Sequence, residues 1–236
     1  PPERRWEWTC ARRSGFARGV TTPTVRITKK GVDRWKAGHP WIYAADVEPA
    51  PKTLVGGEVV RVEDHRGWFL GLAFYSRDSK ITLRWLAWED VAVDREFFKA
   101  RLEAADALRR RALPDETTYR VVHGEADLLP GLVVDRFGDF LSVQFLHKAT
   151  EQRKELITDL LQAHFGCKAI INRSDAGVRR LEGLEPEKGV LRGELPGPIT
   201  YREGHIALEV DLLTGQKTGA FLDQREAHVV RGMARC

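Results

Sequence analysis

The chain has 236 residues, of which 42% are hydrophobic, and a formal net charge of +4 at pH 7. This length suffices for one large domain or two small ones, and this composition excludes bulk disorder. No apolar run is long enough to cross a membrane, and no secretory signal is visible. The three cysteines are scattered, without a CxxC pair. We therefore expect a protein of the reducing cytoplasm with no membrane partner.

The positive charge is concentrated at the N-terminus. Residues 1–20 hold five arginines against two glutamates, so the other 216 residues carry a net charge of only +1. Pro1 to Gly19 follows neither a helical nor a strand period, and we predict that residues 1–24 are a non-native or disordered extension, with the native start at Val20. A basic arm that contacts nucleic acid is the alternative. Nucleic-acid binding by the rest of the chain must rest on a local patch.

Short β-rich runs separated by turns predict a small β-barrel over residues 25–90. Five tryptophans fall in this region, interleaved with lysines and arginines. Single-stranded or looped RNA needs such a surface, because bases stack on aromatic rings and phosphates pair with cations. The predicted RNA-binding residues are Lys29, Lys30, Trp41, Arg77 and Arg84. The alternative, in which the tryptophans form the barrel core and the charges are ordinary surface, stays open.

A single helix is predicted over residues 91–116, between the barrel and the next domain. Asp94 can cap its N-terminus and Pro114 ends it. The arginine triplet in its last turn suits the negative end of the helix dipole, although a phosphate contact is also open. The predicted buried face consists of Phe97, Phe98, Leu102, Ala105 and Leu108.

Residues 117–212 predict a central α/β domain in the order strand, strand, helix, strand, strand. Gly138-Asp139 is a hairpin turn, and an amphipathic helix over Glu151–Phe165 ends at Gly166. The loop from His123 to Gly131 contains a histidine and two carboxylates, which could indicate acid–base chemistry. Its spacing matches no metal-ligand pattern, so we predict a polar loop closed by a Pro-Gly turn and no metal site.

The last stretch, residues 213–236, joins a strand to a helix through a loop with two glycines. Alternating Ile206, Leu208 and Val210 predict the strand, and apolar residues at helical spacing predict a helix over Phe221 to Met233. Such a loop suits an anionic ligand, although a plain connection is equally open. A phosphate-binding P-loop needs glycines where Gln216 and Leu212 stand, which argues against a nucleotide-binding enzyme that uses Lys217.

Several motifs in order now point to one family. They are Lys30-Gly31, Gly38-His39-Pro40-Trp41-Ile42-Tyr43, His123-Gly124-Glu125-Ala126-Asp127, Pro130-Gly131-Leu132-Val133-Val134-Asp135-Arg136, Glu182-Gly183, Gly215-Gln216-Lys217-Thr218-Gly219 and Phe221-Leu222-Asp223-Gln224-Arg225. Together they resemble the bacterial S-adenosylmethionine-dependent large-subunit (23S) rRNA cytosine-5 methyltransferases with an N-terminal PUA domain. The resemblance covers residues 25–233. Ala220 and Leu129 depart from it, since a larger residue and a glycine are expected there.

The resemblance implies an α+β fold. A PUA-like RNA-binding barrel precedes a central α/β domain, and residues 213–236 begin a Rossmann-like methyltransferase domain. It also implies S-adenosylmethionine as cofactor and ribosomal RNA as partner. The segment from Gln216 to Arg225 would line the methionine side of the cofactor site. The residues implied there are Gln216, Lys217, Thr218, Phe221, Asp223, Gln224 and Arg225.

In that family the chain continues into a glycine-rich cofactor strand, an acidic ribose ligand and a cysteine nucleophile, none of which has a match here. We therefore expect a truncated chain with no catalytic residue of its own, no activity alone and little affinity for S-adenosylmethionine. The apolar face of the last predicted helix would be exposed or buried against another chain, so a homodimer stays open. A stand-alone, non-catalytic PUA-type RNA-binding protein is the alternative function.

Overall fold

The computed structural model describes residues 22–225. Its first unit is a five-stranded sheet in the order β1-β3-β4-β5-β2, with β1 parallel to β3 and the other pairs antiparallel. Residues 46–48 follow β2 and bond back to β1, so the sheet curls toward a closed barrel as predicted. The elements are β1 (Thr24–Arg26), α1 (Lys29–Lys36), β2 (Trp41–Tyr43), η1 (Ala44–Asp46), β3 (Val59–Glu63), β4 (Phe69–Tyr75) and β5 (Ile81–Ala87).

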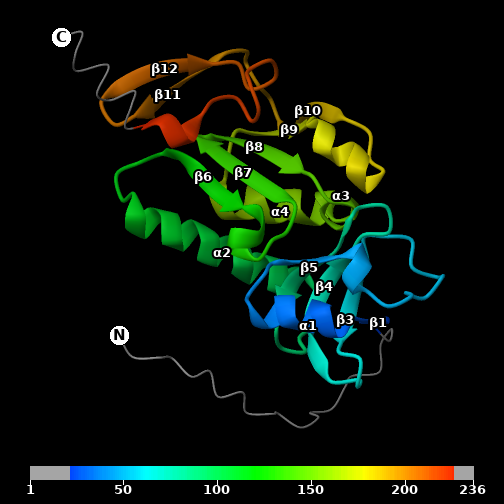
Figure 1. Ribbon diagram of the computed structural model, residues 1–236. Helices are drawn as coiled ribbons and strands as arrows, with labels where there is room; N and C mark the ends of the chain where they lie inside the picture. The colour runs from blue at the N-terminus through cyan, green and yellow to red at the C-terminus, as the bar shows by residue number, and fades with distance from the viewer. Residues whose placement is uncertain (1–21, 226–236) are drawn as a thin grey trace.

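The second unit is also a five-stranded sheet, in the order β10-β9-β8-β7-β6, with only β8 and β9 parallel. Helices α2 and α4 cover one face of this sheet, and the separate hairpin β11–β12 covers the other (Figure 1). The elements are α2 (Arg95–Ala112), β6 (Thr118–His123), η2 (Gly124–Asp127), β7 (Leu132–Phe137), β8 (Phe140–Phe145), α3 (Lys148–Gln152), α4 (Lys154–Phe165), β9 (Ala169–Ser174), η3 (Gly177–Glu182), β10 (Glu187–Gly193), β11 (Ile199–Glu203), β12 (Ile206–Val210) and η4 (Leu222–Gln224).

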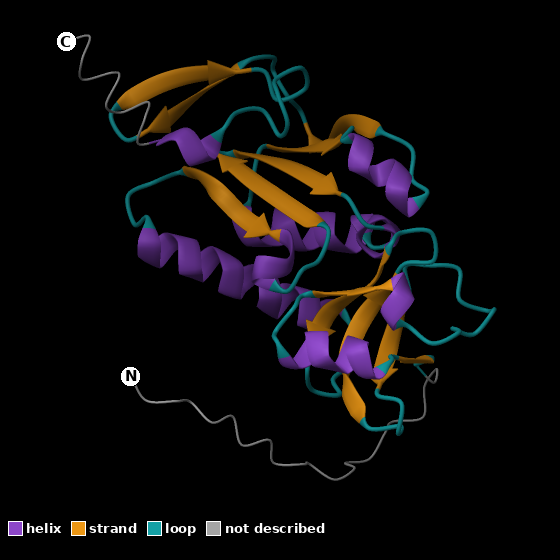
Figure 2. Ribbon diagram, in the orientation of Figure 1, coloured by secondary structure: helices purple, strands orange, loops and turns teal. Residues whose placement is uncertain are grey.

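Strand β4 is buried on both faces, which joins the two units into one body. Leu72 and Phe74 belong to the core that contains α2 and the central sheet, whereas Ala73 and Tyr75 belong to the barrel core. The pleat explains this division, because successive side chains of a strand point to opposite faces. Figure 2 shows the barrel strands directly beneath the helices of the central unit. Neither unit can be displaced without exposing apolar surface of the other.

Helix α2 confirms most of its prediction. Asp94 accepts a hydrogen bond from the Phe97 backbone N–H at 3.1 Å, as an N-cap should, and the helix ends at Ala112. The predicted buried face is wrong for Leu108, which is 47% exposed. The buried position in that turn is Asp106, whose carboxylate receives the Tyr119 hydroxyl at 2.8 Å. A buried carboxylate with partners thus replaces the expected apolar contact.

The central unit differs from the predicted order of elements. The Gly138-Asp139 turn between β7 and β8 is confirmed, and so is Gly166, which is left-handed at the end of α4. The predicted start of the helix is wrong, because α3 begins earlier and a break at Arg153 separates it from α4. Strands β6 and β10 are additional. β10 is a largely exposed edge strand with a bulge, so its sequence lacks the apolar alternation that marks a strand.

The two ends of the chain lie outside the described residues. The predicted extension over residues 1–24 is described only from position 22, and the predicted helix only up to Arg225, where the short turn η4 is seen. No helix among residues 22–225 is both long and apolar enough to cross a bilayer.

The bend before β7 depends on a glycine. Gly131 has φ +74°, and a Cβ there would lie 2.4 Å from the His147 Cβ. We predict that Gly131→Ala destabilises the protein more than Gly138→Ala, whose φ is +60° but whose Cβ position is open. Gly138→Ala should cost about 1–2 kcal/mol for the left-handed backbone. Gly131→Ala should cost about 1–3 kcal/mol more, because it also overpacks the site. Urea denaturation of both variants measures the difference, and equal losses would contradict the clash.

Candidate nucleic-acid interface and cofactor loop

Three of the five predicted RNA contacts are exposed on the barrel. Lys29 and Lys30 lie in the first turn of α1, where Thr28 caps the helix by accepting from the Gly31 backbone N–H at 3.2 Å. Lys30 lies 3.8 Å from Asp46, but its side chain is 70% exposed, so solvent weakens this ion pair. Arg77 is exposed after β4. These three cations are free to meet phosphates.

Arg84 and Trp41, the other two predicted RNA contacts, make hydrogen bonds within the chain, and their contact with RNA stays a prediction. Both donate to the same carboxylate oxygen, Oε1 of Glu125, at 2.8 Å. Arg84 also reaches Oε1 of Glu182 at 3.3 Å, and its guanidinium lies 5.6 Å from the centre of the Trp41 ring. The two carboxylates come from the central unit. The structure therefore places Arg84 and Trp41 between the two units. The Trp41 ring N–H and both terminal nitrogens of Arg84 have partners there, whereas the buried Nε of Arg84 has none among residues 22–225.

A buried histidine completes this contact. His147 packs its ring against Phe74 with the centroids 5.5 Å apart, and its Nε2 faces Ser76 at 3.3 Å and Glu182 at 3.5 Å. Its Nδ1 accepts from the Ala149 backbone N–H at 3.0 Å, so the proton of the neutral ring is on Nε2. We call Trp41, Ser76, Arg84, Glu125, His147 and Glu182 together the seam.

The seam does not have the geometry of a hydrolase triad. In a triad the acid and the nucleophile contact opposite nitrogens of the imidazole. Here Ser76 and Glu182 both face Nε2, and the Ser76 hydroxyl donates to Glu182 itself. Burial, and then the charges of Arg84 and Arg153, lowers the pKa of His147 to about 3. A neutral, enclosed imidazole holds the two units together and has no access to a substrate.

The loop from His123 to Gly131 is a polar connection, as predicted. Its Glu125 belongs to the seam, and Asp127 pairs with Arg109 of α2 at 2.8 Å. Among residues 22–225 no cluster of histidine, cysteine and carboxylate groups could hold a metal ion. The arginine triplet of α2 thus has contacts within the chain through its first two members, since Arg110 pairs with Asp106 at 2.8 Å.

The predicted cofactor loop is tied to the central sheet by two of its own side chains. Thr218 is buried, and its hydroxyl donates a hydrogen bond to Asp135. Arg120 also donates two hydrogen bonds to this carboxylate, at 2.8 and 2.9 Å. Arg225 donates to the backbone carbonyl of Thr118 at the start of β6. Arg173 donates to the backbone carbonyls of Leu212 and Gly215, just before Gln216, at 2.8 and 2.7 Å. Thr218 therefore anchors the loop, and its hydroxyl already has a partner.

The other predicted cofactor residues differ in their exposure, and therefore in how accessible they are to a ligand. Gln216, Lys217, Asp223 and Gln224 are exposed, and Phe221 is half-buried. The Lys217 ammonium lies 4.5 Å from the centre of the Phe221 ring, so the face of that ring is occupied by a cation. Lys217 also has a left-handed backbone with φ 52°. A non-glycine residue in this conformation is strained, as residues at ligand sites often are.

The donor chemistry of this loop fits the methionine end of S-adenosylmethionine. That end carries an ammonium and a carboxylate, which need an anionic and a cationic partner. Asp223 offers the first, and Arg225 offers the second, because its Nε is buried without an acceptor among the described residues. A buried, unpaired donor is unfavourable unless a ligand or another group fills it.

The chain is similar to known proteins over the barrel alone and over most of its length. Residues 25–88 match the family model of a PUA-like domain. Over 209 residues the chain is 35% identical to ribosomal RNA large subunit methyltransferase I of Vibrio cholerae. The aligned region covers 87% of this chain and 53% of the relative. The protein of the same name from Erwinia tasmaniensis is 42% identical over 194 residues, with coverages of 80% and 49%. The chain thus spans about half the length of the curated relatives it matches.

Solved structures show the same fold at low identity. A protein described as a SAM-dependent methyltransferase from Streptococcus mutans is 20% identical, with a TM-score of 0.72 over 87% of this chain and 53% of that chain. A methyltransferase structure solved with SAH is also 20% identical, with a TM-score of 0.74 over 87% of this chain and 52% of that chain. The N-terminal PUA-like domain followed by a mixed α/β unit is therefore an arrangement that methyltransferase structures contain.

The lowered pKa of His147 predicts how stability depends on pH. Folded His147 stays neutral down to about pH 3, whereas the unfolded chain protonates it below pH 6.5. The unfolded state binds more protons in this window, so the free energy of unfolding should fall as the pH falls below 6.5. The contribution is at most about 1.4 kcal/mol per pH unit. Thermal or urea unfolding between pH 7 and 5 measures the slope.

The variant His147→Gln supplies the comparison, since glutamine keeps a donor toward Ser76 but does not titrate. It should be less stable than the parent chain at pH 7, with a flatter slope. His65→Gln, at an exposed histidine in a turn, controls for the loss of an imidazole. A parent slope that persists in His147→Gln would show that other groups cause it.

Proposed function

We propose that this chain is the RNA-binding part of an S-adenosylmethionine-dependent methyltransferase that acts on cytosine C5 of large-subunit rRNA. The observation that carries the proposal is the 35–42% identity to relatives named for rRNA methylation, together with the PUA-like domain at residues 25–88. The exposed cations Lys29, Lys30 and Arg77 on that domain give it a surface that phosphates can contact. Phosphate contacts supply most of the sequence-independent affinity for nucleic acid.

Chemistry at cytosine C5 needs a nucleophile that the described residues do not contain. C5 becomes reactive only after a thiolate adds at C6 of the ring. Cys167 is the free cysteine among residues 22–225, and burial raises the pKa of its thiol. It donates to the Gln162 side chain at 3.3 Å, so it is a protonated packing residue. The role proposed here is therefore to bind RNA and to hold one side of the cofactor.

The cofactor loop would hold S-adenosylmethionine, which supplies the methyl group. Asp223 and Arg225 would bind the methionine ammonium and carboxylate. Gln216, Lys217, Phe221 and Gln224 would border the ligand, and Thr218 would keep the loop on the central sheet through Asp135. The buried Nε of Arg225 supports this assignment.

Replacing the three exposed cations should weaken RNA binding in a salt-dependent way. The variant Lys29→Ala/Lys30→Ala/Arg77→Ala should lower the slope of log affinity against log salt concentration by roughly 2 to 3, because each phosphate contact releases about 0.7–0.9 counterion. Filter binding of a structured rRNA fragment at several salt concentrations measures this slope.

A matched control removes the same charge elsewhere. Lys168, Lys188 and Arg202 are exposed on the central unit and the β11–β12 hairpin, outside the barrel. Their triple alanine variant should keep the parent slope. If both triple variants change the slope equally, only the net charge matters and the barrel is not the RNA surface.

The cofactor loop alone should bind S-adenosylmethionine poorly. The described residues form one wall of a site, so much of the ligand would remain in solvent. Calorimetry on the 236-residue chain should give a dissociation constant on the order of 1 mM or weaker. A chain extended to the length of the relatives should bind in the micromolar range, and Arg225→Ala in that longer chain should weaken binding. Micromolar binding by the 236-residue chain would contradict this account of the site.

A further inference from the structure

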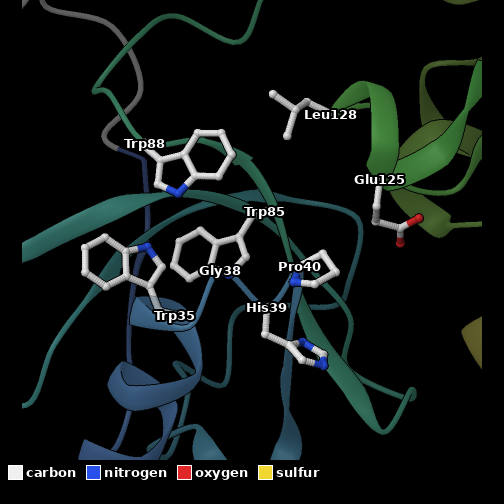
Figure 3. Close-up of a pocket in the computed structure, with 8 residues that line it drawn as sticks. All are labelled: Trp35, Gly38, His39, Pro40, Trp85, Trp88, Glu125 and Leu128. Carbon is white, nitrogen blue, oxygen red and sulfur yellow. The ribbon is translucent and has the colours of Figure 1, made fainter. Parts of the chain in front are cut away.

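A small aromatic cavity lies where the end of α1 meets the central unit. Its volume is about 150 Å³, and Figure 3 shows the three tryptophans grouped beside Pro40, with Leu128 on the other side of Trp88. Six of the lining residues come from the barrel and two come from η2 and its C-cap. The lining residues are Trp35, Gly38, His39, Pro40, Trp85, Trp88, Glu125 and Leu128.

The size and lining of the cavity match one flat ring. Apolar cavities on the order of 150 Å³ accept a ligand as large as benzene. Three tryptophans and a histidine offer ring faces and edges, and Trp35 and Trp85 lie at a tilt of 52° with centroids 6.5 Å apart. Stacking of a nucleobase on such rings adds affinity and tolerates any base, because every base has a π-face.

The carboxylate of Glu125 determines which hydrogen-bonding groups a ligand of the cavity must present. Glu125 receives both Trp41 and Arg84 on the single oxygen Oε1. Its second oxygen, Oε2, accepts no hydrogen bond from residues 22–225, so it remains as an acceptor on a residue that lines the cavity. An ionised carboxylate only accepts hydrogen bonds, so a ligand must present an N–H group. Ring N–H and exocyclic amino groups of nucleobases meet this need.

The wall opposite the barrel is held in a strained backbone conformation. Leu128 follows η2 with φ 54° and ψ 34°, which is left-handed and unusual for leucine. Of residues 22–225, only Leu128 and Lys217 are non-glycine residues with positive φ. Leu128 places an apolar side chain at the cavity (Figure 3) where a glycine would suit the backbone better. Such strain is characteristic of residues that form ligand sites.

We infer that this cavity binds a single unstacked nucleobase of the RNA that the barrel holds, and this inference rests on the proposed function. The phosphates on either side of an extruded base would lie near the exposed Lys36, the last residue of α1, and Lys29 and Lys30 lie at the other end of the same helix. A cage of aromatic rings with a carboxylate also suits a quaternary ammonium ion. Lys36 at the end of α1 repels such a cation, so the base is the favoured occupant.

The test compares two RNA hairpins with the same stem. One carries a single bulged cytidine, and the other has an abasic unit at that position. The 236-residue chain should bind the bulged hairpin roughly tenfold more tightly, as the stacking of one base predicts. Trp88→Ala and Leu128→Gly should each bring this ratio close to one. Trp88 is 40% exposed and glycine suits the backbone at position 128, so both variants should fold.

Trp68→Ala is the matched control. Trp68 is 63% exposed on the same barrel but lies outside the cavity, so its removal should keep the preference. A parent ratio near one, or a ratio kept in both cavity variants, overturns the inference while stem binding still supports the proposed function. Absence of binding to either hairpin removes the proposed function itself. Choline that displaces the bulged hairpin by binding at the tryptophans would assign the cavity to a quaternary ammonium ligand instead.

Discussion

The two-sided burial of strand β4 is the constraint on which the rest of the molecule depends. Leu72 and Phe74 lie in one core, and Ala73 and Tyr75 lie in the other. The hydrophobic stabilisation of each unit therefore includes surface supplied by its neighbour. Independent motion of the barrel would expose both sets of side chains. A PUA-like domain usually described as a module is, in this chain, a fixed wall of the next unit.

The hydrogen bonds and ion pairs of the seam form where the two units pack together. They fix the orientation of one unit relative to the other. Glu182 and His147 are almost fully buried, and Arg84 lies between Glu125 and Glu182. Removing one partner of such a network leaves an uncompensated buried charge, which is more damaging than the pair is stabilising. The pair of units thus has one favoured arrangement. That arrangement also fixes Glu125 and Leu128 against the barrel, so the aromatic cavity exists only because the seam holds.

Local signals in the sequence predicted the local structure. The cap at Asp94, the turn at Gly138-Asp139 and the left-handed Gly166 depend on a few neighbouring residues, and all three are confirmed. The exposed positions of Lys29, Lys30 and Arg77 also agree with what an RNA surface needs, although their contact with RNA stays a prediction.

The parts that sequence reasoning missed depend on contacts between distant residues. The sequence does not show the contacts of Arg84 and Trp41 within the chain, because their partner Glu125 is far away in it. Glu125 lies 41 positions from Arg84 and 84 positions from Trp41. Thr218 likewise owes its buried role to Asp135, 83 positions earlier. Leu108 is exposed and Asp106 is buried in the same turn of α2, where the Tyr119 hydroxyl of β6 donates to Asp106. No period or spacing within one element carries this information.

Strand β6 connects the two candidate sites. The backbone carbonyl of its first residue, Thr118, accepts a hydrogen bond from Arg225 of the cofactor loop. Its last residue, His123, leads into η2 and the cavity wall at Leu128. Six residues of strand span on the order of 20 Å. A base held in the aromatic cavity would therefore lie far from the methionine end of the cofactor. The cavity would bind a neighbouring base and fix the position of the RNA, while the base that reacts lies elsewhere.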